Sequence, residues 1–261
     1  MKNFIEDNNE PFLQVEKSGR VQWLFLNRPK TRNTLSLGMI DAIKNALEEA
    51  YNDNTVGVVV LAAYGPVFSA GHDLHEMQSL QREVLTKCAD MMMSIVHGSK
   101  PVIACIDGIA TAGGCQLVSS CDLAVASEEA QFCTPGVNIG GFCTTPLVGI
   151  GRKIQRKHAM EMALTGELFS AQDAARFGLI NRVIASNLLI VETEKLAQKI
   201  ASKSNTAIEL GKKAFYQQID MPIEDAYAFA TERMIEAHST ADSAEGIRAF
   251  FEKREPKWGG R

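Results

Sequence analysis

Short apolar runs alternate with amphipathic stretches along the first two thirds of the chain. The runs at 56–63, 102–106 and 122–127 have the length and the β-branched content of buried strands. In the stretches that precede and separate them, such as the one after Ser36, apolar residues recur every three or four positions, which is typical of helices. Strands that alternate with helices predict βα units around a mainly parallel sheet.

Further segments on either side of these runs have the pattern of secondary structure. They comprise a hairpin at 12–16 and 21–26, a strand at 131–132, and helices at 36–51, 78–96, 153–164 and 170–178. Ser36 and Ser170 are typical N-caps, and Gly178 is typical of a helix end. The fold class expected from this order of elements is α/β.

The last third of the chain, from 187 to 253, is predicted to be helical throughout. Its apolar positions include Phe215, Tyr227 and Phe250. Helices that do not return to the main core must bury such positions against another surface. We therefore divide the chain into a disordered tail at 1–10, an α/β core at 11–190 and a C-terminal helical region at 191–261.

Two turns rich in small residues each follow an apolar run. After the run at 102–106, Gly108 and the pair Gly113-Gly114 break the strand before a helix of small residues begins. The earlier turn has small residues at 69–71. Such turns can point main-chain N–H groups into a cavity, and a helix N-terminus adds the positive end of its dipole. If the two turns face each other, they form a site for developing negative charge.

Composition and charge exclude several classes of protein. The chain has 261 residues, of which 46% are hydrophobic, enough for one large domain with a real core. Its net charge is −4 and its Lys and Arg residues are scattered, without the basic stripe that nucleic-acid binding needs. The longest apolar runs are about as long as a strand, so we expect neither a membrane span nor a nucleic-acid partner.

The cysteine and histidine patterns argue against a metal site. The six cysteines form no C-x-x-C pair and several lie in apolar segments, which indicates free buried thiols in a reducing compartment. His72 and His75 are the only close pair of histidines, and no cluster of cysteines or carboxylates accompanies them. Acidic residues near position 1 argue against a leader segment, so a cytoplasmic location is expected.

Three phrases of the sequence carry a resemblance to a known family. They are Phe68-Ser-Ala-Gly-His-Asp-Leu74, the stretch from Pro101 to Ala126 with Ala-Thr-Ala-Gly-Gly-Cys-Gln-Leu at its centre, and Leu164-Thr-Gly-Glu167 with Ser170-Ala-Gln-Asp-Ala174. In this order and spacing, the chain resembles the enoyl-CoA hydratase/isomerase (crotonase) superfamily from about residue 12 to the C-terminus. The residues at 115–118 and 134–140 resemble one subgroup of it. The resemblance implies a crotonase-like ββα spiral core and a C-terminal helical region that mediates assembly into homotrimers or hexamers.

The catalytic positions of that family map onto the two turns. By resemblance, the backbone N–H groups of His72 and Gly113 form an oxyanion hole for the thioester oxygen, and losing one such donor costs about 10² to 10³ in rate. The two catalytic glutamates of the hydratases are replaced by Gln116 and Gly136, which cannot transfer protons. Thr144 stands where dienoyl-CoA isomerases of the family have an aspartate.

Few titratable side chains remain near the turns. The imidazole of His72 can act as a base only if it turns inward, and a histidine on such a turn is more often solvated. Asp73 and Asp122 are interpreted as structural hydrogen-bonding residues. The thiols of Cys133 and Cys143 are interpreted as space-filling.

The predicted CoA-binding residues rest on the same resemblance. Lys30 and Arg32 lie in a loop that resembles the family loop meeting the CoA phosphates and pantetheine, and Ser69 and Ala70 match a turn that contacts adenine. Lys253 matches a C-terminal lysine that reaches a CoA phosphate, often on the adjoining protomer. The alternative for the three basic residues is a solvated surface charge. We expect no cofactor, because CoA is part of the substrate thioester.

Together these features indicate an acyl-CoA-processing lyase of this family that stabilises a thioester enolate and hydrates ordinary substrates weakly. One alternative is decarboxylation of a malonyl-type CoA, in which the substrate supplies its own electron pair. Another is a catalytically silent acyl-CoA-binding oligomer. A serine hydrolase is disfavoured, because Val67 replaces the first glycine of the Gly-x-Ser-x-Gly pattern around Ser69.

Overall fold

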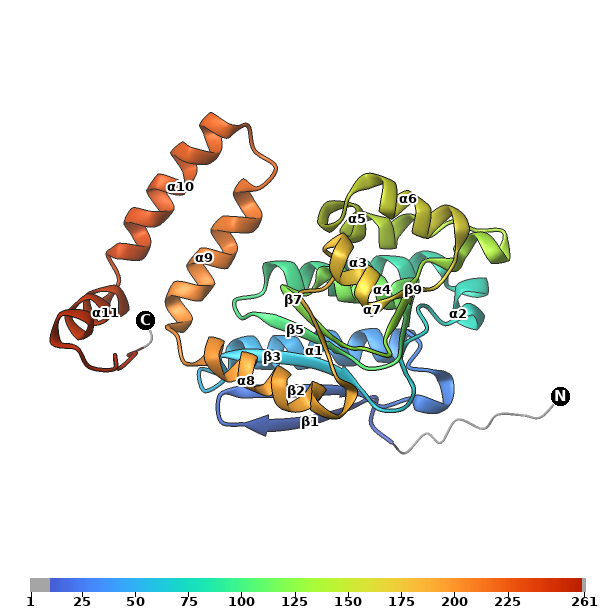
Figure 1. Cartoon of the computed structure of the whole chain (residues 1–261), viewed down its shortest axis with the longest axis horizontal. Helices are drawn as coiled ribbons and strands as arrows, with labels where there is room; N and C mark the ends of the chain where they lie inside the picture. Colours follow the sequence, from blue (N-terminus) through green and yellow to red (C-terminus); the bar gives the residue numbers. More distant parts are fainter. Residues whose placement is uncertain (1–9, 260–261) are drawn as a thin grey trace.

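The computed structural model of the chain describes residues 10–259 and consists of two sheets covered by helices (Figure 1). The larger sheet has the strands β1 (Leu13–Ser18), β2 (Val21–Leu26), β3 (Val58–Ala63), β5 (Val102–Ile106), β7 (Leu123–Ser127) and β10 (Arg182–Ile184), in this order. The smaller sheet has the strands β4 (Val67–Ser69), β6 (Ile109–Thr111), β8 (Gln131–Cys133) and β9 (Phe169–Ser170). Among these strands, only the pairs β1–β2 and β8–β9 are antiparallel, so the predicted α/β fold with a mainly parallel core is confirmed.

Helices form most connections between strands and nearly all of the C-terminal third. In the core they are α1 (Leu37–Asn52), α2 (Leu74–Ser79), α3 (Gln81–His97), α4 (Gly113–Ser120), α5 (Thr144–Lys153), α6 (Arg156–Thr165) and α7 (Ala171–Phe177). They are followed by α8 (Leu189–Ala201), α9 (Asn205–Gln218), α10 (Ile223–His238) and α11 (Ala241–Glu252). Short 3-10 helices lie at Pro29–Thr31, Pro135–Ile139 and Ser186–Leu188. The predicted caps are confirmed: the side chains of Ser36 and Ser170 accept hydrogen bonds in the first turns of α1 and α7, and Gly178 ends α7.

The central strand β3 explains why the strands read as uninterrupted apolar runs. Val58 and Val60 belong to a buried cluster that includes Ala197 of α8. Val59 and Leu61 belong to the main core, which also contains the buried faces of α1 and α3. Because helices cover both faces of the sheet, alternate side chains of one strand pack against different helices and all of them must be apolar.

Two of the predicted helices need correction. The segment 78–96 does not form one helix, because the chain leaves helical geometry at Leu80, between α2 and α3. The helix predicted at 153–164 begins at Arg156, because Lys153 instead ends α5 and Ile154 is extended. The helix α5 was not predicted, because it contains one proline and two glycines, which are poor helix formers.

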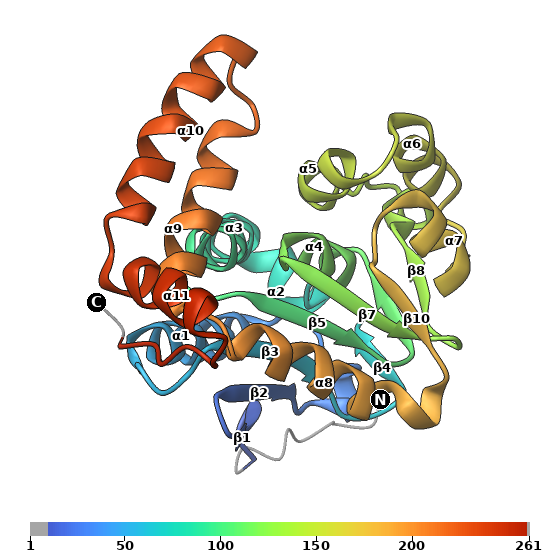
Figure 2. The same ribbon diagram turned by 60° about the vertical axis from the view of Figure 1, so that its left-hand side comes forward.

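The C-terminal helices differ in how they use their apolar residues (Figures 1 and 2). Helix α8 buries Leu189, Ala197 and Ala201 against the larger sheet, whereas α9 and α10 extend beyond the sheets in both views and α11 follows α10. These three helices and their links expose Phe215, Ile219, Met221, Ile223, Tyr227, Met234, Ile235, Ile247, Phe250 and Phe251. The division of the chain at 190/191 remains a prediction, and residues 1–9 of the predicted tail lie outside the described residues.

Candidate active site

The two turns lie side by side because the strands that lead into them pair in the smaller sheet. Strands β4 and β6 are parallel neighbours, with Ser69 opposite Ala110. This pairing brings Gly71 against the start of α4, so that a Cβ atom on Gly71 would lie 3.0 Å from the backbone nitrogen of Gly113. The prediction that the two turns face each other is confirmed.

Glycine is required where the two turns touch. Gly71 has a φ of 83°, a conformation that residues with a side chain rarely adopt. A Cβ atom on Gly114 would lie only 2.4 Å from the carbonyl oxygen of Ser69. The backbone at the start of α4 and the backbone of the turn at 69–71 are therefore in direct contact.

The residue before α4, Ala112, is held in a strained conformation. Its φ of 48° and ψ of −113° lie in a region that costs a non-glycine residue on the order of 1–3 kcal/mol. Its N–H donates to the carbonyl oxygen of Cys133 at 2.9 Å, which holds the turn to β8. This turn places Gly113 at the first position of α4 and beside Gly71.

Two main-chain donors at this junction are available. Gly113 is the first residue of α4, so its N–H has no acceptor inside the helix. Within residues 10–259, no hydrogen bond takes up this N–H or that of His72. The neighbouring N–H groups differ, since Ala70 donates to the carbonyl oxygen of Arg32 at 3.0 Å and Gly71 to the hydroxyl of Ser69 at 3.3 Å.

The side chain of His72 points toward Gly113, as a catalytic role of its imidazole would require. Its Cε1 atom would lie 3.4 Å from a Cβ atom on Gly113. Its Nε2 atom is buried and has no hydrogen-bond partner in the described part of the chain. Burial lowers the pKa of the imidazole below its ordinary value of 6.5, so the ring is neutral at pH 7.

Asp73 and Asp122 have the structural roles predicted for them. Asp73 caps α2 by accepting hydrogen bonds from the N–H groups of His75 and Glu76. Asp122 accepts a hydrogen bond at 2.8 Å from the N–H of Val102, the first residue of β5. Both carboxylates therefore bind backbone N–H groups at the start of an element, and these contacts give neither of them a role in proton transfer.

Gln116 lies on α4, one turn after Gly113. The residue is 6% exposed, and its side-chain Oε1 is buried without a partner among the residues described. A buried amide oxygen without a partner costs about 1–3 kcal/mol, so a ligand or water that donated to it would remove this cost. The amide is uncharged and keeps the site polar without supplying protons.

Gly136 lies in the 3-10 helix after β8 and faces a cysteine. A Cβ atom on Gly136 would lie 3.0 Å from the backbone nitrogen of Cys143 and 3.1 Å from its sulfur. Burial raises the pKa of the Cys143 thiol, and likewise raises that of Cys133 to about 11. Both thiols are therefore neutral at pH 7 and inert. The sequence did not reveal this contact, because Gly136 and Cys143 belong to a loop without a regular pattern.

The predicted CoA-binding residues do not all gather at the turns. Lys30 and Arg32 are exposed on the loop next to the first turn, whereas Ser69 is fully buried and donates to the carbonyl oxygen of Asn33 at 2.8 Å. Lys253 follows α11, and α11 and α2 lie on opposite sides of the molecule (Figure 1). One chain therefore does not bring Lys253 to the two turns.

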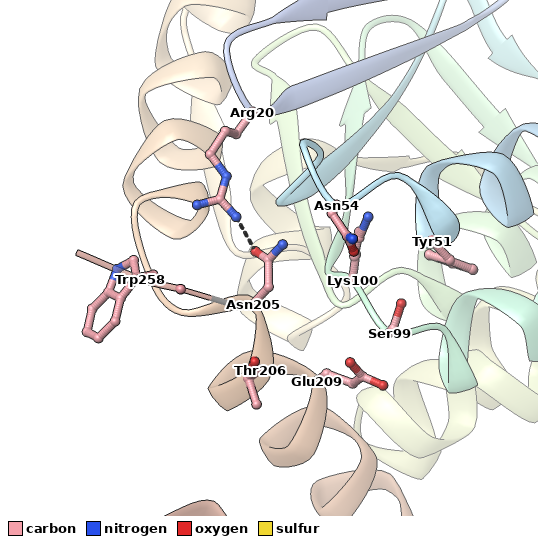
Figure 3. Close-up of a pocket in the computed structure, with 10 residues that line it drawn as sticks. Arg20, Tyr51, Asn54, Ser99, Lys100, Asn205, Thr206, Glu209 and Trp258 are labelled. Atoms are coloured by element: carbon pink, nitrogen blue, oxygen red, sulfur yellow. Dashed lines mark hydrogen bonds between the residues drawn. The ribbon is translucent and has the colours of Figure 1, made fainter. Parts of the chain in front are cut away.

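A separate polar pocket of about 340 Å³ lies between the core and the start of α9 (Figure 3). In it, Arg20 donates to the side chain of Asn205 at 2.6 Å. Lys100 is 5% exposed and donates to the carbonyl oxygens of Ala50 and Asp53 at the end of α1. Burial lowers the pKa of Lys100 to about 8. Sequence reasoning missed this pocket, because a lysine just before an apolar run has the pattern of a solvated loop.

The cysteines, the metal-ligating residue types and the helices of the described part of the chain indicate no other kind of site. The cysteines at 88, 105, 115, 121, 133 and 143 are all buried and free, as predicted. Within residues 10–259, no three His, Cys, Asp or Glu residues lie close enough to hold a metal ion. Each helix described is too short or too polar to cross a membrane.

The fold and the paired glycine turns agree with the result of comparison with known families. The sequence model described as Enoyl-CoA hydratase/isomerase matches residues 16–261. The chain therefore belongs to the enoyl-CoA hydratase/isomerase family, as its three phrases predicted.

Within that family, the predicted subgroup is also confirmed, because the chain is similar to enoyl-CoA hydratase domain-containing protein 3. The Mus musculus protein of this name is 43% identical over 256 residues, which cover 96% of this chain and 85% of the relative. The Danio rerio protein is 45% identical over 264 residues, covering 99% and 91%. The crystal structure of the human protein matches with a TM-score of 0.92 and 42% identity, covering 95% of this chain and 100% of that one.

The expectation of a cytoplasmic protein is wrong. The relatives from Mus musculus and Danio rerio are both named as mitochondrial proteins. Free buried thiols indicate only a reducing environment, which more than one compartment provides. The composition of the folded chain could therefore not settle its location.

Proposed function

We propose that the protein binds acyl-CoA thioesters between the two turns and stabilises their enolates with the N–H groups of His72 and Gly113. The observation that carries this proposal is the contact of Gly71 with Gly113, which places both N–H groups at one junction without acceptors from the described chain. Charge that develops on a thioester oxygen is stabilised by donors that are already oriented toward it. The positive end of α4 adds to this stabilisation.

The proton chemistry of the site differs from that of a hydratase. Gln116 and Gly136 cannot transfer protons, and each positioned acid or base is worth about 10² to 10⁴ in rate. We therefore expect weak hydration of ordinary enoyl-CoA esters. Decarboxylation of a malonyl-type CoA is favoured as a second candidate, because the uncharged amide of Gln116 does not repel the substrate carboxylate as a glutamate would.

CoA recognition is assigned to Lys30 and Arg32 next to the first turn and to the main chain at Ser69 and Ala70. Lys253 lies far from the turns of its own chain, so we assign it to the site of a neighbouring protomer. Members of this family commonly assemble into oligomers. The exposed aromatic and aliphatic residues of α9 to α11 provide an apolar surface for a homotrimer or hexamer.

Hydration of crotonyl-CoA, followed as loss of the conjugated thioester absorbance, tests the proposal. We expect slow turnover by the native protein and a gain of about 10² in Gln116→Glu, which restores one proton-transferring group. Gln116→Met is the matched control, because it keeps the side-chain length and restores no such group. A glutamate at position 136 is a poorer test, because its Cβ atom would contact the backbone of Cys143.

The outcomes separate the candidate functions. Ordinary hydration rates in the native protein would contradict the assignment of weak proton chemistry. Release of CO₂ from malonyl-CoA by the native protein, reduced in Gln116→Glu, would support decarboxylation. Binding of both esters without turnover would indicate the catalytically silent acyl-CoA-binding oligomer, and failure to bind either ester would refute the proposed function.

A further inference from the structure

We infer that the imidazole of His72 is the proton-transferring group of this site and that its substrate is an acyl-CoA with a hydrogen on the α-carbon. This inference rests on the proposed function, in which the same residue contributes its backbone N–H. The side chain and the backbone of one residue would then act on neighbouring atoms of the thioester.

The position of the ring is the first observation. The Cε1 atom of His72 would lie 3.4 Å from a Cβ atom on Gly113, so the ring is next to this residue. The N–H of Gly113 is the second proposed donor. The α-carbon of a thioester is bonded directly to the carbonyl carbon. A ring beside the N–H groups that hold the carbonyl oxygen is therefore within reach of the α-carbon as well.

Two unpartnered polar atoms near Gly113 are the second observation. The Nε2 of His72 and the Oε1 of Gln116 are both buried, and neither has a hydrogen-bond partner within residues 10–259. Gln116 is three residues after Gly113, so both lie on one side of α4. Buried polar groups are usually paired, and two unpaired ones beside free N–H groups point to a ligand.

The surroundings of the ring keep it in the form of a base. Burial, without a contribution from a charged neighbour, is what lowers the pKa of His72. On its own turn, Asp73 caps α2 and Glu76 accepts the N–H of Leu37 at 2.7 Å. From the other packed elements, α4 carries no charged side chain, and the loop before α1 contributes the apolar Leu35.

The step can be written with atoms and electrons in balance. Neutral His72, protonated on Nδ1, accepts the α-proton at Nε2. The α-carbon–hydrogen bond breaks, the Nε2–hydrogen bond forms, and the electron pair moves to the thioester oxygen as an enolate held by the two N–H groups. The imidazolium then returns a hydron to the α-carbon. When the imidazolium first exchanges with heavy water, the substrate gains deuterium without any net reaction.

Incorporation of deuterium into the α-carbon of butyryl-CoA, measured by mass spectrometry in heavy water, tests the inference. We compare the native protein with His72→Gln and His72→Ala, which keep the backbone N–H and lose the imidazole. His75→Gln is the matched control, since His75 is an exposed histidine three residues further on. Binding of butyryl-CoA, by calorimetry, and thermal unfolding are measured on each variant.

We expect both His72 variants to bind butyryl-CoA and to exchange about 10² to 10⁴ more slowly than the native protein, with His75→Gln unchanged. As the pH is lowered, the native exchange rate should begin to fall only below pH 6.5, the ordinary pKa of an imidazole. Exchange by either folded His72 variant within threefold of the native rate would overturn the inference, as would native binding without exchange. Absence of native binding would instead refute the proposed function.

Discussion

Two buried polar regions of the molecule differ in where their polar groups find partners. We call Lys100, Asp122, Lys212 and Tyr216 the anchor. In the anchor, Lys212 forms an ion pair with Asp122 at 2.7 Å and also donates to the carbonyl oxygen of Lys100, while the hydroxyl of Tyr216 donates to Asp122 at 3.1 Å. Between the two turns, the Nε2 of His72 and the Oε1 of Gln116 have no partner among the described residues.

The difference teaches how to tell a structural polar cluster from a binding site in this fold. A buried charge with partners in its own chain fixes one element to another, and the anchor fixes α9 to the start of β5. A buried polar atom without a partner lowers stability unless a ligand supplies the partner. Substitutions in the anchor should therefore change stability, and substitutions between the turns should change binding and proton transfer.

The largest expected effect is the loss of the Asp122 carboxylate. Asp122→Ala leaves Lys212, whose side chain is 7% exposed, without its counter-ion. We expect the free energy of unfolding to fall by about 3–5 kcal/mol, measured by urea denaturation at fixed protein concentration. Asp41→Ala breaks an ion pair of similar length, 2.8 Å to Lys87, but at the surface, and should cost less than about 1 kcal/mol. Equal losses in the two variants would remove the distinction between the regions.

The next effect is a dependence of stability on pH through Lys100. Its pKa is lowered to about 8 by burial, partly opposed by Asp53, from 10.5 when unfolded. Between these values the unfolded chain binds more protons, so this group makes the folded state more stable as pH rises. Native protein should gain about 2 kcal/mol over Lys100→Met between pH 7.5 and 9.5.

The comparison with Lys100→Met is needed because other groups also change the stability of the fold between pH 7.5 and 9.5. The buried thiols have raised pKa values, Cys88 and Cys105 to about 12, so they lower stability in both proteins over the same range. Denaturation at several pH values measures both curves. A difference that stays constant from pH 7.5 to 9.5 would show that Lys100 is charged and fully compensated in the fold.

The smallest expected effect lies between the turns. Gln116→Met replaces the amide by an apolar group of similar length, and it should raise the free energy of unfolding by about 1 kcal/mol because the unpaired Oε1 is removed. Ser204→Ala is the contrasting variant, because the Ser204 hydroxyl is buried, caps α9 and donates to Asp242. It should lower stability by about 1 kcal/mol. Destabilisation by Gln116→Met would mean that the amide has a structural role.

Much of the fold could be predicted from the sequence, because the signals that define it are local. The apolar run at 102–106 coincides with β5, and the serine caps of α1 and α7 are where the sequence placed them. The break at Leu80 was missed because no glycine or proline marks it, and the helix α5 was missed because it contains residues of weak helix propensity. The two turns were found because glycine is itself a backbone signal.

The remaining parts of the site depend on contacts between distant segments. No local pattern shows that the His72 ring lies over Gly113 or that Gly136 packs against Cys143. The role of Lys100 was also missed, because its partners, Ala50 and Asp53, are about fifty residues earlier in the chain. The roles assigned to the site residues stay predictions until substrates are tested.

The most direct test of the central claim is to compare the binding of butyryl-CoA with that of S-butyl-CoA, a thioether that lacks only the carbonyl oxygen. Isothermal calorimetry measures both dissociation constants on the native protein. If the N–H groups of His72 and Gly113 receive the carbonyl oxygen, leaving them unpaired costs about 1–3 kcal/mol, and the thioester binds roughly ten- to a hundredfold more tightly. Equal affinities for the two ligands would contradict the account, because the paired turns would then not contact the thioester oxygen.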